Sequence, residues 1–168
     1  MDIKDYLEQF DVTDKESQLS ILICDPEPVP VAANMIWVDP KQLLKPSQFS
    51  QSSQSSEPSS SSQSSQHAHH FKDQTFNLTL CGHFLFLNGH LSEKDHLDTL
   101  LELIRISSEV RVAPLLDLHG QPSKHLGPIL QALQEQGYGV ELREIKSNQK
   151  PHKEALLRLW NATCTVQT

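Results

Sequence analysis

The sequence predicts an α/β protein built on a mostly parallel sheet, and three features of residues 76–118 indicate this. An apolar run from Phe76 to Leu87 is typical of a strand buried on both faces of a parallel sheet. An amphipathic helix from about Ser92 to Ser107 follows it, and a β-branched run from Glu109 then ends at Pro114. Parallel strands joined by a helix cross over in a right-handed sense, so we expect helices to cover the sheet.

The start and the buried face of this helix are both marked in the sequence. Ser92 and Asp95 have the spacing of a capping box, in which each side chain accepts from a backbone N–H group of the other residue. Apolar residues at positions 97, 100, 101 and 104 recur at helical spacing. We therefore expect Leu101 and Ile104 to be buried against the sheet.

Residues 1–45 contain a short helix and two further strand candidates. Asp2 to Phe10 has the amphipathic spacing of a helix, which we interpret as a lid on the core, because only Lys4 is basic and a membrane-surface helix would carry more basic residues. Leu19–Cys24 and Met35–Val38 read as strands. Prolines at positions 26, 28 and 30 exclude a long helix or central strand between them and leave room for one helical turn over Val31–Asn34.

The C-terminal part of the chain predicts a loop, a helix and a pair of strands. Residues 115–123 have the turn chemistry of a loop, and Leu126 to Leu133 has helical periodicity with Gly137 placed as a left-handed cap. Tyr138–Ile145 and Glu154–Trp160 follow as strands separated by a polar turn. We expect these two strands to form an antiparallel pair at the edge of the sheet.

A polar tract divides the chain into three parts. Of residues 47–66, 17 are Ser or Gln, so we expect 46–75 to be a disordered linker that joins 1–45 and 76–162 into one domain. The tract ends in His67, His69 and His70. We interpret them as the solvated end of this tract in preference to a metal site, because no fixed scaffold orients the imidazoles.

Composition excludes some classes of function. The net charge is −7 and the chain has no basic stripe, so nucleic-acid binding through phosphate contacts is not expected. No apolar run approaches the roughly 20 residues that span a bilayer, so we expect no membrane association. Three widely spaced cysteines without a CxxC pair indicate reduced thiols in a cytoplasmic protein.

The predicted ending and the local sequence resemble the class I S-adenosylmethionine-dependent methyltransferase superfamily, in particular an uncharacterised bacterial branch. In that fold the last strand inserts antiparallel between its neighbours. Three segments carry the resemblance, and they are residues 76–87, 109–120 and 153–159. Cys81-Gly82-His83-Phe84-Leu85-Phe86 is the most specific of them. The resemblance implies a truncated Rossmann-like sheet, mostly parallel with a C-terminal antiparallel hairpin and helices on both faces.

The resemblance also implies a set of residues that bind S-adenosylmethionine. Asp25 ends the first strand where the cofactor loop begins, and Asp39 ends the second, where the family has an acidic residue for the ribose hydroxyls. Cys81 and Gly82 end the fourth strand of the family's order, where cofactor and acceptor meet. Cys81 has a second interpretation as core packing in a buried strand.

On the acceptor side the resemblance implies a catalytic histidine. His83 could act as a general base, or it could be a strand-end histidine that hydrogen-bonds a neighbouring loop. Asp117 and His119 follow the next strand at the same edge, where ligands of open α/β sheets bind. Asp117 could equally cap its own loop.

Three hypotheses about function remain open at this point. The first is methyl transfer to a small-molecule or protein acceptor that the sequence does not specify, as it also does not specify the oligomeric state. The second is a catalytically inactive, methyltransferase-like interaction domain, because the loop 25–30 has no glycine and the Ser/Gln tract replaces the adenine-side segment. The third and weaker hypothesis is metal binding through the histidines.

Overall fold

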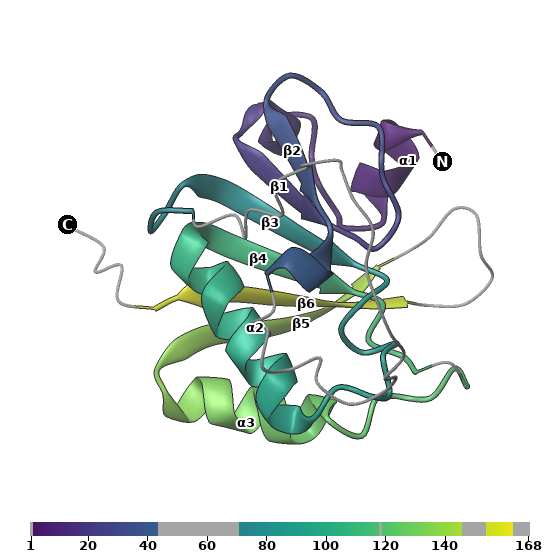
Figure 1. Cartoon of the computed structure of the whole chain (residues 1–168), viewed down its shortest axis with the longest axis vertical. Helices are drawn as coiled ribbons and strands as arrows, with labels where there is room; N and C mark the ends of the chain where they lie inside the picture. The colour runs from purple at the N-terminus through teal and green to yellow at the C-terminus, as the bar shows by residue number, and fades with distance from the viewer. Residues whose placement is uncertain (1, 44–70, 118, 146–153, 163–168) are drawn as a thin grey trace, which may run out of the picture.

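The described residues fold around one mixed sheet of six strands, with helices on both faces. The computed structural model describes residues 2–43, 71–117, 119–145 and 154–162. Within them the strand order is β2-β1-β3-β4-β6-β5, as Figure 1 shows. The strands are β1 (Ile21–Cys24), β2 (Met35–Val38), β3 (Phe76–Gly82), β4 (Ser107–Ala113), β5 (Tyr138–Ile145) and β6 (Glu154–Asn161).

The pairing of the strands confirms a mostly parallel sheet with an antiparallel ending. β1 pairs in parallel with β2 and with β3, and β3 pairs in parallel with β4. β6 runs antiparallel between β4 and β5, so β5 at the edge points in the same direction as the first four strands. The chain thus lays β2 on one side of β1 and then returns to lay β3 on the other side.

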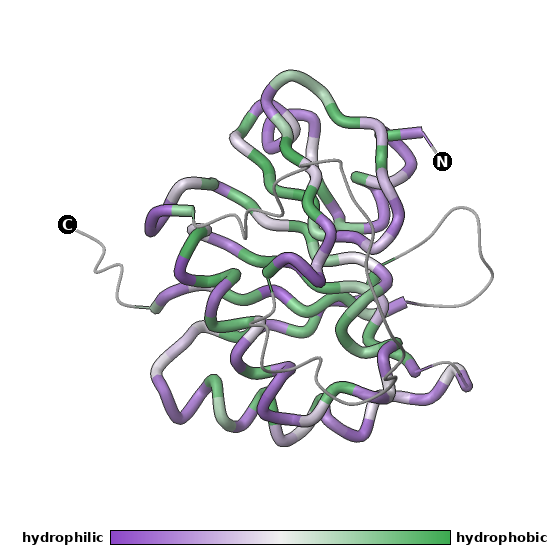
Figure 2. The backbone as a smooth tube through the Cα atoms, in the orientation of Figure 1, coloured by the Kyte–Doolittle hydropathy of each residue, from purple (hydrophilic) through white to green (hydrophobic). Residues whose placement is uncertain are grey.

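Two hydrophobic clusters separate the faces of the sheet. The helices are α1 (Ile3–Glu8), α2 (Glu93–Ile106) and α3 (Leu126–Glu135), with short 3₁₀ turns at Glu16–Gln18 (η1) and Pro40–Gln42 (η2). Buried residues of α2 and α3 share one cluster with the sheet, and buried residues of α1 belong to the other. Figure 2 shows hydrophobic stretches running through the central strands, while the outer turns are largely hydrophilic.

The capping box of α2 is confirmed. The Ser92 hydroxyl accepts from the Asp95 N–H at 3.2 Å, and the Asp95 carboxylate accepts from the Ser92 N–H at 3.0 Å. Ile104 is buried as expected, but Leu101 is only half-buried. The buried stripe runs through Leu100 and Leu103, so Leu101 lies at the rim of the helical face and not at its centre.

Two local expectations were wrong. The strand predicted for Phe76–Leu87 ends at Gly82, because His83 adopts a left-handed backbone with φ +46° and turns the chain out of the sheet. The apolar residues 84–86 are buried in a turn instead, and periodicity alone does not separate these two outcomes. No helical turn forms over Val31–Asn34, where one hydrogen bond from the Met35 N–H to the Ala32 carbonyl closes a tighter turn.

The C-terminal elements follow the sequence closely. β5 and β6 occupy the expected ranges, and Gly137 follows α3 with φ +84°. Cys24 and Cys81 are buried free thiols in strands. The Ser/Gln tract, the histidines at 67–70 and the turn 146–153 lie outside the described residues. None of the helices in the described parts is long and apolar enough to cross a membrane.

Candidate functional site

A pocket of about 590 Å³ opens at the carboxyl edge of the sheet, beside α1. Its lining residues come from α1, from the loop after β1 and from the end of β3, and they are Tyr6, Asp25, Pro26, Glu27, Pro28, Val29, Pro30 and His83. β1 and β3 are neighbours in the sheet, and the strand order reverses between them. Ligands of open α/β sheets bind outside the carboxyl ends of strands at such a reversal.

The buried Asp25 carboxylate, at the end of β1, contacts side chains from α1 and from the end of β3. One of its oxygens, Oδ2, accepts from the Tyr6 hydroxyl at 3.0 Å and lies 3.1 Å from Nδ1 of His83. The Asp25 side chain is 4% exposed, whereas that of His83 is 41% exposed. The carboxylate is therefore the inner end of the pair, and the imidazole is the group that reaches the pocket.

Gly82 makes this arrangement sterically feasible. A Cβ at this position would lie 2.3 Å from Asp25 Oδ2 and 2.6 Å from the Tyr6 hydroxyl oxygen. The next residue, His83, is anchored by its N–H to the Ala113 carbonyl at 3.2 Å. The absence of a side chain at position 82 and the left-handed backbone at position 83 together aim the imidazole at Asp25.

The loop after β1 is fixed by hydrogen bonds to its carbonyl oxygens. The Trp37 indole N–H, from β2, lies 3.0 Å from the Asp25 carbonyl oxygen and 3.1 Å from that of Glu27. The Glu27 N–H donates to Asp25 Oδ1 at 3.1 Å, which closes the loop on the carboxylate. The wall of the pocket is thus preformed, although three of its residues are prolines without an N–H group.

The electrostatic character of the pocket is acidic. Asp25 and Glu27 supply two carboxylates, and no Lys or Arg is among the lining residues. Burial, together with the neighbouring Asp25 carboxylate, raises the pKa of the Tyr6 hydroxyl above its ordinary value. Tyr6 therefore stays protonated as a hydrogen-bond donor to Asp25.

The structure brings together only part of the predicted site. Asp25, Gly82 and His83 meet at the pocket, but Asp39 and Cys81 are not among its lining residues. Asp39 accepts from the Lys41 N–H at 3.0 Å and caps η2. Cys81 pairs in register with Cys24, and both thiols pack in the hydrophobic cluster beneath α2. The hydrogen bond with Cys81, and then burial, raise the pKa of the Cys24 thiol.

Asp117 and His119 lie in a separate loop after β4. The Asp117 carboxylate accepts from the N–H groups of His119 at 2.8 Å and of Gln121 at 3.0 Å. These hydrogen bonds, that from Gln121 first, lower the pKa of Asp117. The contacts are those of a carboxylate that caps its own loop, and neither residue lines the pocket.

Sequence reasoning missed three residues of the site, namely Tyr6, Glu27 and Trp37. Tyr6 was part of the apolar stripe of the first helix and was interpreted only as packing. A buried tyrosine hydroxyl needs a partner, so its position on that stripe is the one signal that could have pointed to a nearby acceptor. Among the described residues, no group of three His, Cys, Asp or Glu side chains is arranged to hold a metal ion.

Comparison with known proteins gives little direct guidance. No family model matches the sequence. A curated relative, an uncharacterized protein of Methanocaldococcus jannaschii, is 46% identical over 61 residues, which are 36% of this chain and 28% of the relative. The match thus spans under a third of the length of that relative.

The comparison with solved structures gives one partial match. It is a magnesium protoporphyrin IX methyltransferase from Synechocystis PCC 6803 with bound S-adenosylmethionine, 10% identical, matched over 52% of this chain and 40% of that one with a TM-score of 0.35. A score this low carries no argument about function. The strand order and the contacts in the pocket are the observations that bear on the function of this chain.

Proposed function

We propose that this chain is an S-adenosylmethionine-dependent, methyltransferase-like protein that transfers a methyl group to an acceptor, with His83 as general base. One observation carries the proposal. Asp25 and His83 follow the two strands that flank the reversal of strand order, and their side chains meet 3.1 Å apart in a pocket. The antiparallel insertion of β6 between β4 and β5 agrees with the methyltransferase resemblance of the sequence.

The role of His83 follows from its contact with Asp25. A carboxylate at Nδ1 favours the tautomer with the proton on Nδ1, so Nε2 carries the lone pair that can accept a proton. When Nε2 accepts, the buried carboxylate stabilises the resulting imidazolium. Tyr6 holds the same oxygen of Asp25 from the other side and fixes the direction of the carboxylate.

The pocket suits the charge and size of the proposed cofactor. Its volume of about 590 Å³ lies within the range of roughly 300–1,000 Å³ typical of small-molecule sites. S-adenosylmethionine supplies a methyl group on a positively charged sulfonium. We propose that the acidic loop 25–30 holds this cation and that the cofactor extends beyond the lining residues to Asp39, which accepts from the ribose hydroxyls. The contribution of the protein is then mainly to position donor and acceptor.

A second candidate function is ligand or partner binding without catalysis. It is favoured by the loop 25–30, which has no glycine and whose prolines offer no N–H groups at positions 26, 28 and 30. In this alternative the sheet keeps its topology after losing the cofactor, because a fold does not fix a function.

Calorimetric titration with S-adenosylmethionine and S-adenosylhomocysteine tests the proposal. We expect the wild type to bind both, and Asp39→Ala to weaken binding about ten- to a hundredfold, since hydrogen bonds to a charged group contribute about 1.5–3 kcal/mol. His83→Gln should retain binding of both ligands, and its matched control is His90→Gln on the same loop. Absence of wild-type binding at millimolar ligand would favour the second candidate.

A further inference from the structure

We propose that the pocket selects organic cations, an ammonium or sulfonium group with apolar substituents, and that Glu27 determines this selectivity. The inference rests on the proposed function only for the location of the ligand. It adds a class of ligand and a specificity-determining residue that methyl transfer alone does not require.

The side chains that line the pocket carry more negative than positive charge. The lining contains the carboxylates of Asp25 and Glu27, and no Lys or Arg. The chain as a whole carries a net charge of −7, which has the same sign as this acidic wall. These carboxylates repel a carboxylate or phosphate ligand and attract a cation, and His83 is the one basic side chain among the described lining residues.

The loop 25–30 offers few hydrogen-bond donors to a ligand in the pocket. Along the loop, three prolines lack an N–H group, and the N–H of Glu27 is used by Asp25. The Tyr6 hydroxyl is likewise directed to Asp25 and not into the pocket. In the loop 25–30, prolines and internal hydrogen bonds thus leave few donors beside the Glu27 carboxylate, which suits a ligand that brings its own N–H groups.

The two carboxylates of the pocket differ in their partners. Asp25 is occupied by Tyr6, by His83 and by the Glu27 N–H, and its side chain is 4% exposed. Glu27 is exposed at the pocket, and within the part of the chain that the structure describes its carboxylate has no hydrogen bond or ion pair. Glu27 is thus the carboxylate that can meet a cation directly.

The pocket also has an apolar wall, which can contact the carbon part of a ligand. Pro26, Pro28, Pro30 and Val29 add apolar surface beside the carboxylates. A site that combines apolar walls with a few placed polar groups favours an amphipathic small molecule over a hydrated metal ion. The ligand class is therefore an organic cation.

Three probes of one shape test this inference, namely benzylamine, benzyl alcohol and benzoate, which are cationic, neutral and anionic at pH 7. Their binding to the full chain is measured by NMR titration of protein amide signals at low salt. We expect benzylamine to bind about five- to tenfold more tightly than benzyl alcohol, and benzoate not to bind, because one carboxylate close to the ammonium contributes about this factor. Added salt should reduce the preference.

The matched variants are Glu27→Gln and Glu8→Gln. Both remove one exposed carboxylate, but Glu8 lies on α1 outside the pocket lining. Glu27→Gln should abolish the preference for benzylamine and leave benzyl alcohol binding unchanged, while Glu8→Gln should retain the preference. Equal binding of the amine and the alcohol, tight binding of benzoate, failure of all three probes, or equal losses in both variants would overturn the inference.

The outcome is separable from that of the proposed function. If benzylamine is preferred through Glu27 but S-adenosylmethionine does not bind, the cation site stands and the cofactor assignment fails. If S-adenosylmethionine binds and Glu27→Gln changes no probe, the cofactor assignment stands and the cation site fails.

Discussion

Two regions on the α1 side of the sheet contain charged side chains, and the two regions differ in how these charges are paired. In the first, the ion-pair network, Arg111 lies on β4 with a side chain that is 2% exposed. Its guanidinium donates to the carboxylates of Glu16 and Glu109 and to the carbonyl oxygens of Phe10 and Asp11. The single buried charge of Arg111 is thus matched by two carboxylates and two carbonyl oxygens.

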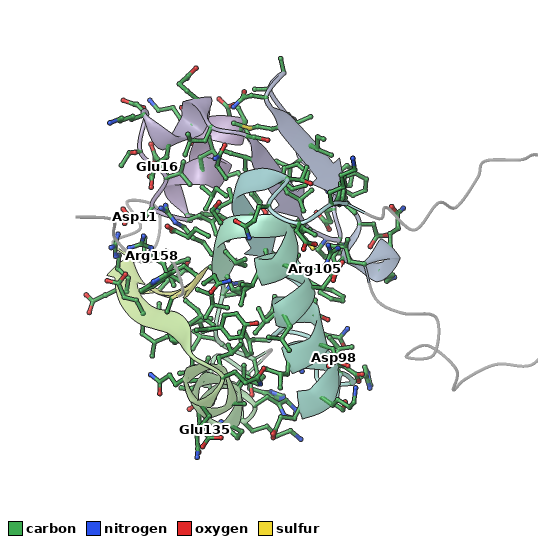
Figure 3. All side chains as sticks on the ribbon, turned by 90° about the vertical axis from the view of Figure 1, so that its left-hand side faces the viewer. Asp11, Glu16, Asp98, Arg105, Glu135 and Arg158 are labelled. Atoms are coloured by element: carbon green, nitrogen blue, oxygen red, sulfur yellow. The ribbon has the colours of Figure 1, made fainter. Side chains whose placement is uncertain are left out.

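The network continues across the antiparallel strands. Arg158 on β6 donates to Glu109 on β4 and to Glu141 on β5, and Arg143 links Glu141 back to Asp11. Figure 3 shows Asp11, Glu16 and Arg158 together on the side of the sheet opposite α2. This chain of pairs ties the segment after α1 to the last three strands in the sheet.

The pocket has the reverse arrangement. Asp25 and Glu27 face it without a guanidinium or ammonium partner among the lining residues. Matched charges in the network hold the elements together. In the pocket, Asp25 is matched by Tyr6 and His83, whereas the Glu27 carboxylate has no partner within the described residues and is left for a ligand. The comparison therefore predicts large effects on stability in the network and effects on binding in the pocket.

The largest effect is expected for Arg111→Met. Removing the buried guanidinium breaks the ion pair of Glu16 and leaves Glu109 with Arg158 alone. We therefore expect a loss of about 3–5 kcal/mol in the free energy of unfolding in urea. Lys94→Met is the control, because Lys94 is exposed on α2 and its pair with Asp98 should contribute little to stability. A loss below about 1 kcal/mol for Arg111→Met would show that the network does not hold this face.

Gly82→Ala should give the next largest effect, at the pocket. The added methyl group would lie 2.3 Å from Asp25 Oδ2, so the carboxylate or α1 must move. Overpacking of this kind costs about 1–3 kcal/mol in the free energy of unfolding. Gly89→Ala is the control, since a Cβ there meets nothing within 4 Å. Equal stability of the two variants would mean that the contact between Asp25 and Tyr6 yields easily.

Much of the fold could be predicted because it depends on local patterns. The capping box of Ser92 and the apolar periodicity of α2 are contained in adjacent residues, and so are the two C-terminal strands. The bend at His83 could not be predicted in this way. It depends on a hydrogen bond to Ala113 and on a left-handed backbone, both set by tertiary contacts.

The site was predictable only where it follows from the ends of strands. Asp25 and His83 were assigned through the resemblance to the methyltransferase fold, which puts both residues at the carboxyl ends of strands. Tyr6 and Glu27 were missed because α1 and the proline-rich loop reach this edge by packing that no sequence spacing encodes. Asp39 and Asp117 also follow strands, but each caps its own turn in the structure.

Tyr6→Phe sharpens the comparison through the pH dependence of stability. Burial and Asp25 raise the pKa of Tyr6 above its unfolded value of 10.0. The stabilisation by the neutral hydroxyl is then fully present below about pH 10 and is lost as pH rises further, because the unfolded chain ionises first. We expect Tyr6→Phe to lose about 0.5–1.5 kcal/mol at pH 7 and to weaken this alkaline loss. Tyr138→Phe, outside the pocket lining, is the control for the removal of a tyrosine hydroxyl elsewhere in the protein.

The smallest effect on the free energy of unfolding is expected for Glu27→Gln. We compare it with Glu16→Gln, which removes a carboxylate that has partners in the network. Burial opposes ionisation of Glu16, but hydrogen bonds from the Thr13 backbone and from Arg111 lower its pKa to about 2. The stability from Glu16 is therefore present above about pH 4.5 and is lost as pH falls toward 2. Glu16→Gln should flatten this acid limb and cost about 1 kcal/mol at pH 7.

Glu27→Gln, by contrast, should change the free energy of unfolding by less than about 0.5 kcal/mol, because the carboxylate contributes no ion pair within the described residues. Urea unfolding at pH 7 of both variants measures the difference directly. A loss for Glu27→Gln as large as that for Glu16→Gln would show that Glu27 is matched within the protein. The pocket would then be a second structural network and not an acceptor site that awaits a cation.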